Sequence, residues 1–168
     1  MNASSEVDDK GRVGEPMEWS ESTSLANRLS LIMANQGYGF KQFVADVVAG
    51  DYDETQAQKE IDEFITSDET AVTMYSFTTC PFCRRAKDAL EERNVPYTTV
   101  ELDELPDNQG NIIRAQLGKF TKRTSVPSIF IHGRYIGGCN DGSPGLLPLM
   151  SDEGEFNKLL LSSPSLPR

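Results

Sequence analysis

Apolar residues recur with the period of a helix in the first third of the chain. Spacings of three, four, seven and eight residues predict amphipathic helices at 25–33, 40–48 and 57–65. In each helix the apolar side chains form a single stripe. Because such a stripe must be buried, we expect all three helices to pack against the remainder of the protein.

Small and polar residues mark where these helices begin and end. Gly37 and Gly39 are expected to end the first helix, and Gly50 is expected to end the second. Asp53 is followed three residues later by Gln56, which resembles a capping box and predicts the start of the third helix.

From residue 71 onward, short apolar runs alternate with helical patterns. Strands are predicted at 71–77, 96–102, 128–131 and 134–136, and helices at 84–93, around 111–120, at 146–150 and at 155–161. The pair His132-Gly133 separates the last two strands and predicts a hairpin turn. Strands joined through a helix run parallel and a hairpin is antiparallel, so the expected fold class is α/β with a mixed sheet.

Charge divides the chain at the same place. The 168 residues include 26 acidic and 16 basic side chains, and the first 70 residues hold fifteen of the acidic and five of the basic ones. The net charge of −10 therefore belongs to the N-terminal part. We predict a disordered acidic tail at 1–22, a helical extension at 23–70 and a folded domain at 71–168. The extension either shields the domain or recruits a partner, and packing against the domain is the favoured interpretation.

Composition also excludes several classes of function. The acidic excess argues against nucleic acid as a partner, and no apolar run is long enough to span a membrane. The N-terminus has neither the apolar core of a secretory signal nor the basic character of a transit peptide. Three cysteines are too few for a secreted scaffold held by disulfides. We therefore expect a reducing compartment, the cytoplasm, with an organelle left open.

Two of the three cysteines form a C-P-F-C motif between a predicted strand and a predicted helix. Pro81 suits the first helical turn, which places Cys80 at the N-cap beside free backbone N–H groups and the positive end of the helix dipole. Positive charge is added within two turns by Arg84, Arg85 and Lys87. Thiols in such positions have pKa values of roughly 3.5 to 7.5. We predict that Cys80 is a nucleophile and Cys83 its resolving thiol.

A zinc site is the first alternative for this motif. Zinc usually takes four protein ligands, and outside the motif the sequence offers only His132 and Cys139, at a spacing that suits zinc poorly. We therefore expect no metal site.

A proline beyond the predicted helices indicates a binding groove. Pro127 stands at the start of a predicted strand but has no N–H to donate to a neighbouring strand. A cis peptide bond between Val126 and Pro127 is one way for the chain to accommodate this proline. Such a bond would present the Val126 backbone to an extended peptide alongside Cys80.

The segment 137–141 adds a second wall to this groove. Its two glycines permit close approach of the backbone, and Asn140 or Asp141 is expected to cap the following helix, whose N–H groups attract a carboxylate. Lys122 and Arg123 provide charges for a second carboxylate. Each feature alone is an ordinary turn or a solvated basic pair. Together they predict a small, thiol-bearing ligand with two carboxylates.

Three motifs, in order, resemble those of glutaredoxins. The first motif, TTCPFC, is similar to the active-site T-x-C-P-Y-C. The second, KRTSVPSIFIHGRYIGG, is similar to the G-R-T-S-V-P stretch that runs on to I-G-G. The third, CND, is similar to C-D-D. The resemblance covers about residues 71–161. It implies a thioredoxin-like fold, a four-stranded mixed sheet flanked by helices, here preceded by a small α-helical extension. It also implies a glutathione-disulfide oxidoreductase that reduces protein disulfides and glutathione mixed disulfides, with glutathione as co-substrate.

The resemblance also assigns roles by position. Cys80 is implied to be the nucleophile and Cys83 the resolving thiol. The resemblance implies that Val126 and Pro127 bind the cysteinyl backbone of glutathione. It implies that Cys139, Asn140 and Asp141 bind the γ-glutamyl end, and that Arg123 and Arg114 bind the glycyl carboxylate. The implied partners are glutathione and glutathionylated or disulfide-bearing proteins, and we expect a monomer.

The sequence departs from the glutaredoxin pattern in a few places. Phe77 stands where many members have a lysine, which predicts weaker glutathione binding or a higher Cys80 pKa. Lys122 stands where Gly is usual, and Asn140 replaces an Asp. Extra Gly and Pro residues after the CND motif predict that the following helix starts late.

An iron–sulfur carrier is the alternative function. Two subunits would each supply Cys80 and one glutathione to a [2Fe–2S] cluster. Relatives of that kind more often have Gly or Ser after the first cysteine, so Pro81 disfavours this cofactor.

Overall fold

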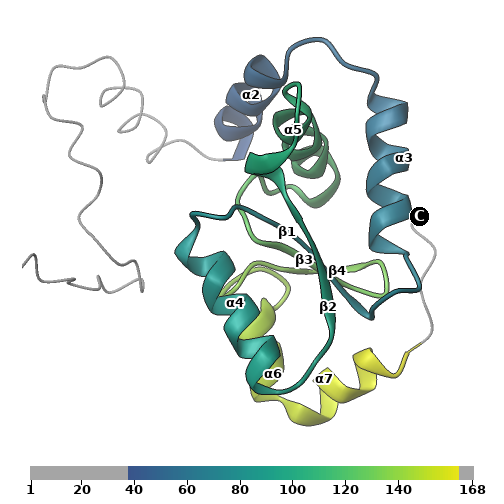
Figure 1. Ribbon diagram of the computed structural model, residues 1–168. Coiled ribbons are helices and arrows are strands. Elements are labelled where there is room, and N and C mark those ends of the chain that lie inside the picture. The colour runs from purple at the N-terminus through teal and green to yellow at the C-terminus, as the bar shows by residue number, and fades with distance from the viewer. Residues whose placement is uncertain (1–37, 163–168) are drawn as a thin grey trace, which may run out of the picture.

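The computed structural model describes residues 38–162 (Figure 1). The tail predicted at 1–22 and the helix predicted at 25–33 lie outside the described residues. Within 38–162, no helix combines the length and the apolar character that crossing a membrane requires.

Four strands form one mixed sheet in the order β2-β1-β3-β4. The strands are β1 (Val72–Ser76), β2 (Tyr97–Glu101), β3 (Ser128–Ile131) and β4 (Arg134–Gly137). β1 runs parallel to β2 and antiparallel to β3, which pairs antiparallel with β4. The predicted mixed sheet is therefore confirmed, with β1 and β3 at its centre.

The buried sheet has a separate core on each face. β1 is buried at all five positions because it lies between two strands and under helices on both sides. Successive side chains of a strand point to opposite faces, so Met74 and Tyr75 belong to different clusters. Met74 packs with α4 (Pro81–Glu92), α6 (Leu146–Ser151) and α7 (Glu153–Leu160).

The second core joins the domain to its N-terminal extension. Tyr75 and Phe130 pack here against Leu117 of α5 (Gln109–Thr121) and against Ile61 and Ile65 of α3 (Glu54–Ile65). Both isoleucines are fully buried, because α3 lies directly on the sheet beside α5 (Figure 1). The extension packs against the domain, as expected, and the core is continuous across residue 70.

The helix α2 (Tyr38–Ala49) corrects the expectation of a buried apolar stripe. Phe43, Val47 and Val48 are 61%, 63% and 51% exposed. The helix instead contacts α5 through a polar residue, because the buried Gln42 side chain donates a hydrogen bond from Nε2 to the Ala115 carbonyl at 3.0 Å. A helical period alone therefore located this helix but not the face that it buries.

Most predicted helix ends agree with the structure. Gly50 follows α2 with a φ of +70°, and Asp53 caps α3 by accepting a hydrogen bond from the Gln56 N–H at 3.0 Å. Gly39 does not end a helix, because it lies inside α2. The helix predicted at 84–93 begins three residues earlier, at Pro81, because Cys80 is its N-cap.

The predicted hairpin between β3 and β4 is also present. His132 and Gly133 both have positive φ values, 48° and 78°. Two such residues are typical of a type I′ turn, whose twist matches that of the flanking strands. The short 3-10 helix η1 (Leu102–Glu104) follows β2 and leads into the loop before α5.

Candidate active site

The C-P-F-C motif lies where β1 gives way to α4. Cys80 is the N-cap residue with an extended backbone, and Pro81 occupies the first turn, as the sequence predicts. The Sγ atom of Cys80 accepts a hydrogen bond from the Cys83 N–H at 3.3 Å. One of the free N–H groups at this helix end therefore stabilises negative charge on Cys80.

The two thiols have opposite tendencies to ionise. The hydrogen bond with the Cys83 side chain is the largest cause that lowers the pKa of Cys80 to about 6, and it outweighs burial, which acts the other way. The backbone N–H groups of Cys83 and Phe82 and the charge of Lys87 also lower this pKa. The hydrogen bond to Cys80 and then burial raise the pKa of Cys83. Exposure differs in the same sense, since Cys80 is partly exposed and Cys83 is 0% exposed.

Two carboxylates organise the surroundings of the motif and were not predicted. Lys87 forms an ion pair with Glu101 at the end of β2, so its charge is partly neutralised. Asp103 accepts a hydrogen bond from the Thr78 N–H at 3.0 Å and holds the loop that leads to Cys80. Neither carboxylate belongs to a local motif, which is why the sequence did not indicate them.

The loop before β3 brings a backbone strand beside Cys80. The Val126–Pro127 peptide bond is cis, as predicted. The carbonyl oxygen of Val126 lies 3.9 Å from the Sγ atom of Cys80. A peptide that paired with Val126 would therefore lie next to this sulfur.

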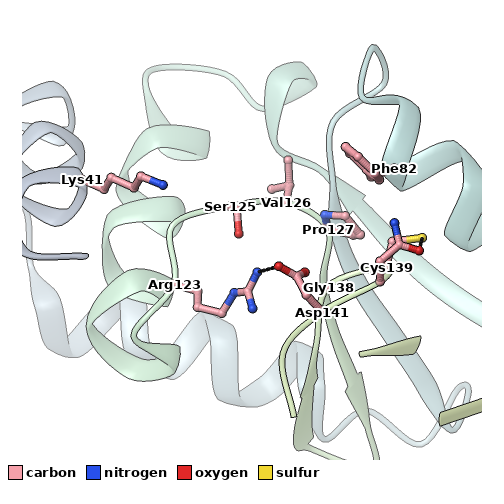
Figure 2. A pocket seen from close by; sticks show the side chains of 10 residues that line it. Lys41, Phe82, Arg123, Ser125, Val126, Pro127, Gly138, Cys139 and Asp141 are labelled. Carbon is pink, nitrogen blue, oxygen red and sulfur yellow. Dashed lines mark hydrogen bonds and ion pairs between the residues drawn. The ribbon is translucent and has the colours of Figure 1, made fainter. Parts of the chain in front are cut away.

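A cavity of about 500 Å³ extends from this point (Figure 2). Its walls contain most of the predicted binding residues, and the lining residues are Lys41, Phe82, Arg123, Ser125, Val126, Pro127, Gly138, Cys139, Asn140 and Asp141. Arg114 lies apart from them, in an adjoining pocket that shares Lys41 and Ser125 with this cavity. Lys41 comes from α2, and no motif in the sequence indicated it.

The turn after β4 requires glycine at its first position. Gly137 has a φ of +111°, and a Cβ atom there would lie 2.6 Å from the Asp141 carbonyl oxygen. The turn is closed by the Gly138 N–H, which donates to that same oxygen at 2.7 Å. This geometry places Cys139, Asn140 and Asp141 on the cavity wall.

Capping of the next helix was predicted wrongly. The N-cap of α6 is Gly145, which makes no side-chain hydrogen bond, and neither Asn140 nor Asp141 caps the helix. Asp141 instead forms an ion pair with Arg123, at 2.8 Å from its Nη2 atom (Figure 2). The helix does start late, at Leu146, as expected.

Arg114 is held by its own neighbours. Its Nε donates a hydrogen bond to the Thr124 carbonyl at 2.8 Å, and its guanidinium lies 5.5 Å from the centre of the Phe77 ring. Burial lowers the pKa of Arg114 from its usual value. Phe77 has no charge of its own, but its ring lies against the cationic side chain of Arg114.

The third cysteine has a different character. Cys139 is buried, and burial is the main cause that raises the pKa of its thiol to about 11. It reaches the cavity wall without being ionised at neutral pH. Among the residues at 38–162, no group of three or more His, Cys, Asp or Glu is arranged to hold a metal ion.

Comparison with known proteins agrees with this geometry. The glutaredoxin family model matches residues 72–136. Glutaredoxin-1 of Rhizophagus irregularis is 39% identical over 89 residues, which are 53% of this chain and 81% of that protein. Glutaredoxin-2 of Schizosaccharomyces pombe is 41% identical over 91 residues, which are 52% of this chain and 81% of that protein.

Solved structures of the same kind match the fold. The crystal structure of the buckwheat glutaredoxin–glutathione complex has a TM-score of 0.56 at 28% identity and covers 64% of this chain and 89% of its own. Oxidized glutaredoxin 2 from Chlamydomonas reinhardtii has a TM-score of 0.53 at 34% identity and covers 65% of this chain and 94% of its own. The fold is therefore thioredoxin-like, and the glutaredoxin relatives indicate a thiol–disulfide oxidoreductase. With most of the length of these relatives aligned to it, the chain belongs to the glutaredoxin family.

Proposed function

We propose that the protein is a glutathione-dependent oxidoreductase that reduces glutathione mixed disulfides and protein disulfides. Cys80 is the nucleophile and Cys83 the resolving thiol. The observation that carries this proposal is the position of the Cys80 sulfur: partly exposed, held by the Cys83 N–H, and 3.9 Å from the Val126 carbonyl at the edge of the cavity.

The first step is attack of the Cys80 thiolate on the glutathione sulfur of a mixed disulfide. The bond between that sulfur and the substrate protein breaks, and the protein leaves as a thiolate that takes a proton from water. A second glutathione, as its thiolate, then attacks the glutathione sulfur now bound to Cys80. Glutathione disulfide is released, and Cys80 leaves again as a thiolate. Its lowered pKa makes it both an available nucleophile and a good leaving group near neutral pH.

The second thiol provides a route for protein disulfides. When Cys80 is held in a mixed disulfide with a substrate protein, its sulfur is neutral and no longer accepts a charge-assisted hydrogen bond from the Cys83 thiol. The main cause of the raised Cys83 pKa is then removed, although burial remains. Cys83 can lose its proton and attack Cys80, which releases the reduced substrate and leaves a Cys80–Cys83 disulfide. Two glutathione molecules restore the dithiol and leave as glutathione disulfide.

The cavity supplies the binding site for the tripeptide. The Val126 backbone, with Pro127, lies beside the cysteinyl backbone of glutathione, and Cys139, Asn140 and Asp141 hold its γ-glutamyl end. Arg123 and Arg114 provide positive charge for the glycyl carboxylate. The buckwheat relative, whose structure is a complex with glutathione, supports this choice of ligand. We further propose a monomer that works in a reducing compartment, the cytoplasm.

Two serine variants test the assignment. Cys80→Ser should abolish deglutathionylation of a glutathionylated peptide, because no nucleophile remains. Cys83→Ser should retain it, because the second glutathione completes that cycle. Equal loss in both variants would contradict the assigned roles. Anaerobic purification tests the iron–sulfur alternative, since a brown protein with visible absorption would support cluster binding over this function and a colourless one would argue against it.

A further inference from the structure

A lysine of the N-terminal extension lines the same cavity as the loops around the thiols. Lys41 belongs to α2, which precedes the region that the glutaredoxin family model matches. Its side chain extends toward the loop that carries Ser125 and Val126 (Figure 2). The extension therefore contributes to the wall of the cavity.

The position of Lys41 is fixed by contacts of the helix that carries it. The neighbouring Gln42 is buried and donates to the Ala115 carbonyl at 3.0 Å, and it packs against Gly118, where a Cβ atom would lie 2.1 Å from its Oε1. At the other end of α2, the Asn108 side chain donates to the carbonyls of Val48 and Ala49, each at 3.1 Å. Hydrogen bonds join both ends of α2 to α5 and its N-cap residue, so the packing of α2 sets the place of Lys41 at the cavity.

The cations at this end of the cavity differ in their availability. Arg123 is paired with Asp141, and Arg114 is engaged with the Thr124 carbonyl and the Phe77 ring. Lys41 is exposed and makes no hydrogen bond or ion pair with any residue that the structure describes. It is therefore the cation most free to bind an anion that enters the cavity.

The direction of the groove selects which anion Lys41 would meet. Figure 2 shows Lys41 and Cys139 on opposite sides of Val126. An extended tripeptide whose middle residue lies at Val126 and whose γ-glutamyl end lies toward Cys139 directs its glycyl end toward Lys41. We propose that Lys41 binds the glycyl carboxylate of the glutathione moiety, so that the helical extension is part of the substrate site. This inference rests on the proposed function.

Three variants of the full chain separate a charge effect from a structural one. Lys41→Gln removes the charge, Lys41→Arg keeps it, and Lys158→Gln is a matched control because Lys158 is 77% exposed on α7, away from the cavity. With a glutathionylated peptide as substrate, Lys41→Gln should raise KM about twofold to fivefold with little change in kcat, which is the upper part of the range for a solvent-exposed ion pair. Lys41→Arg should restore most of the loss, and Lys158→Gln should match the unaltered protein.

A modified substrate identifies the carboxylate. The same peptide is glutathionylated with glutathione whose glycyl carboxylate is an ethyl ester. The ester should raise KM for the unaltered protein by at least the same factor, because Arg123 and Arg114 lose the same charged partner, and Lys41→Gln should then cause no further increase, because its interaction is already absent. An equal penalty of Lys41→Gln on both substrates, or no penalty on either, would overturn the inference. If the unaltered protein turned over neither substrate faster than Cys80→Ser, the proposed function itself would fail.

Discussion

Replacing Ile61 by alanine measures how far the N-terminal extension stabilises the domain. Ile61 lies on α3, outside the matched family region, and is 0% exposed in the core that includes Tyr75, Leu117 and Phe130. The substitution keeps the helix, since alanine favours helices at least as well as isoleucine does. It therefore removes packing between the extension and the sheet without changing the backbone.

The expected loss follows from the atoms removed. Alanine lacks three carbon groups of isoleucine, and each buried group contributes about 0.8 kcal/mol, which gives about 2.4 kcal/mol. The cavity that remains adds a further cost, because strands β1 and β3 and helix α5 cannot all move into it. We expect the free energy of unfolding to fall by about 3 kcal/mol, and Tm to fall by about 6–12 °C for a domain of this size.

Urea and thermal unfolding, followed by circular dichroism, give both quantities. Val47→Ala is the matched control, because Val47 is 63% exposed on α2 and should change the free energy of unfolding by no more than about 0.5 kcal/mol. A loss below about 1 kcal/mol for Ile61→Ala would refute the reasoning. So would a separate early transition for α3 that left the main transition unmoved, since the extension would then unfold independently of the sheet.

Three further predictions concern the thiols and one glycine. The rate at which iodoacetamide alkylates Cys80, followed by mass spectrometry, should fall as the pH drops through about 6, because the thiolate is then protonated. In Cys83→Ala the midpoint of this pH dependence should move to higher pH, since the largest cause of the low Cys80 pKa is lost. Cys139 should stay unlabelled in the native protein at pH 7, because burial raises its pKa to about 11, and rapid labelling would contradict this burial. Gly110→Ala should lower the free energy of unfolding by about 1–3 kcal/mol in a urea titration, because the alanine Cβ would lie 1.9 Å from the Leu102 carbonyl oxygen. An unchanged urea midpoint would show that α5 is not packed this closely on η1.

Local chemistry explains why much of the site could be predicted. The N-cap position of Cys80 depends on Pro81 and on the strand and helix patterns on either side, all of which lie within a few residues. The cis bond before Pro127 and the hairpin at His132 depend on similarly short stretches. Interactions between near neighbours in the chain leave a signature in the order of residue types.

The burial of each helix shows where a local pattern is insufficient. The period in α3 correctly placed Ile61 and Ile65 in the core, because the helix lies on an apolar sheet face. The same period in α2 suggested that Phe43 and Val47 would be buried, but both are exposed, since the helix contacts α5 through Gln42. A helical period in the sequence indicates that a helix has an apolar stripe. The element against which the helix packs determines which of its faces is buried.

Relations between distant segments were decided by the tertiary structure alone. The pairing of Arg123 with Asp141 and the entry of Lys41 into the cavity join residues that are far apart in the chain. The sequence determined that a thiol would lie at a helix N-terminus beside a cis-proline loop. Only the packing of α2 on α5 decided that a lysine of the extension reaches that loop, because a contact of this kind depends on how whole elements are placed and not on the residues next to it.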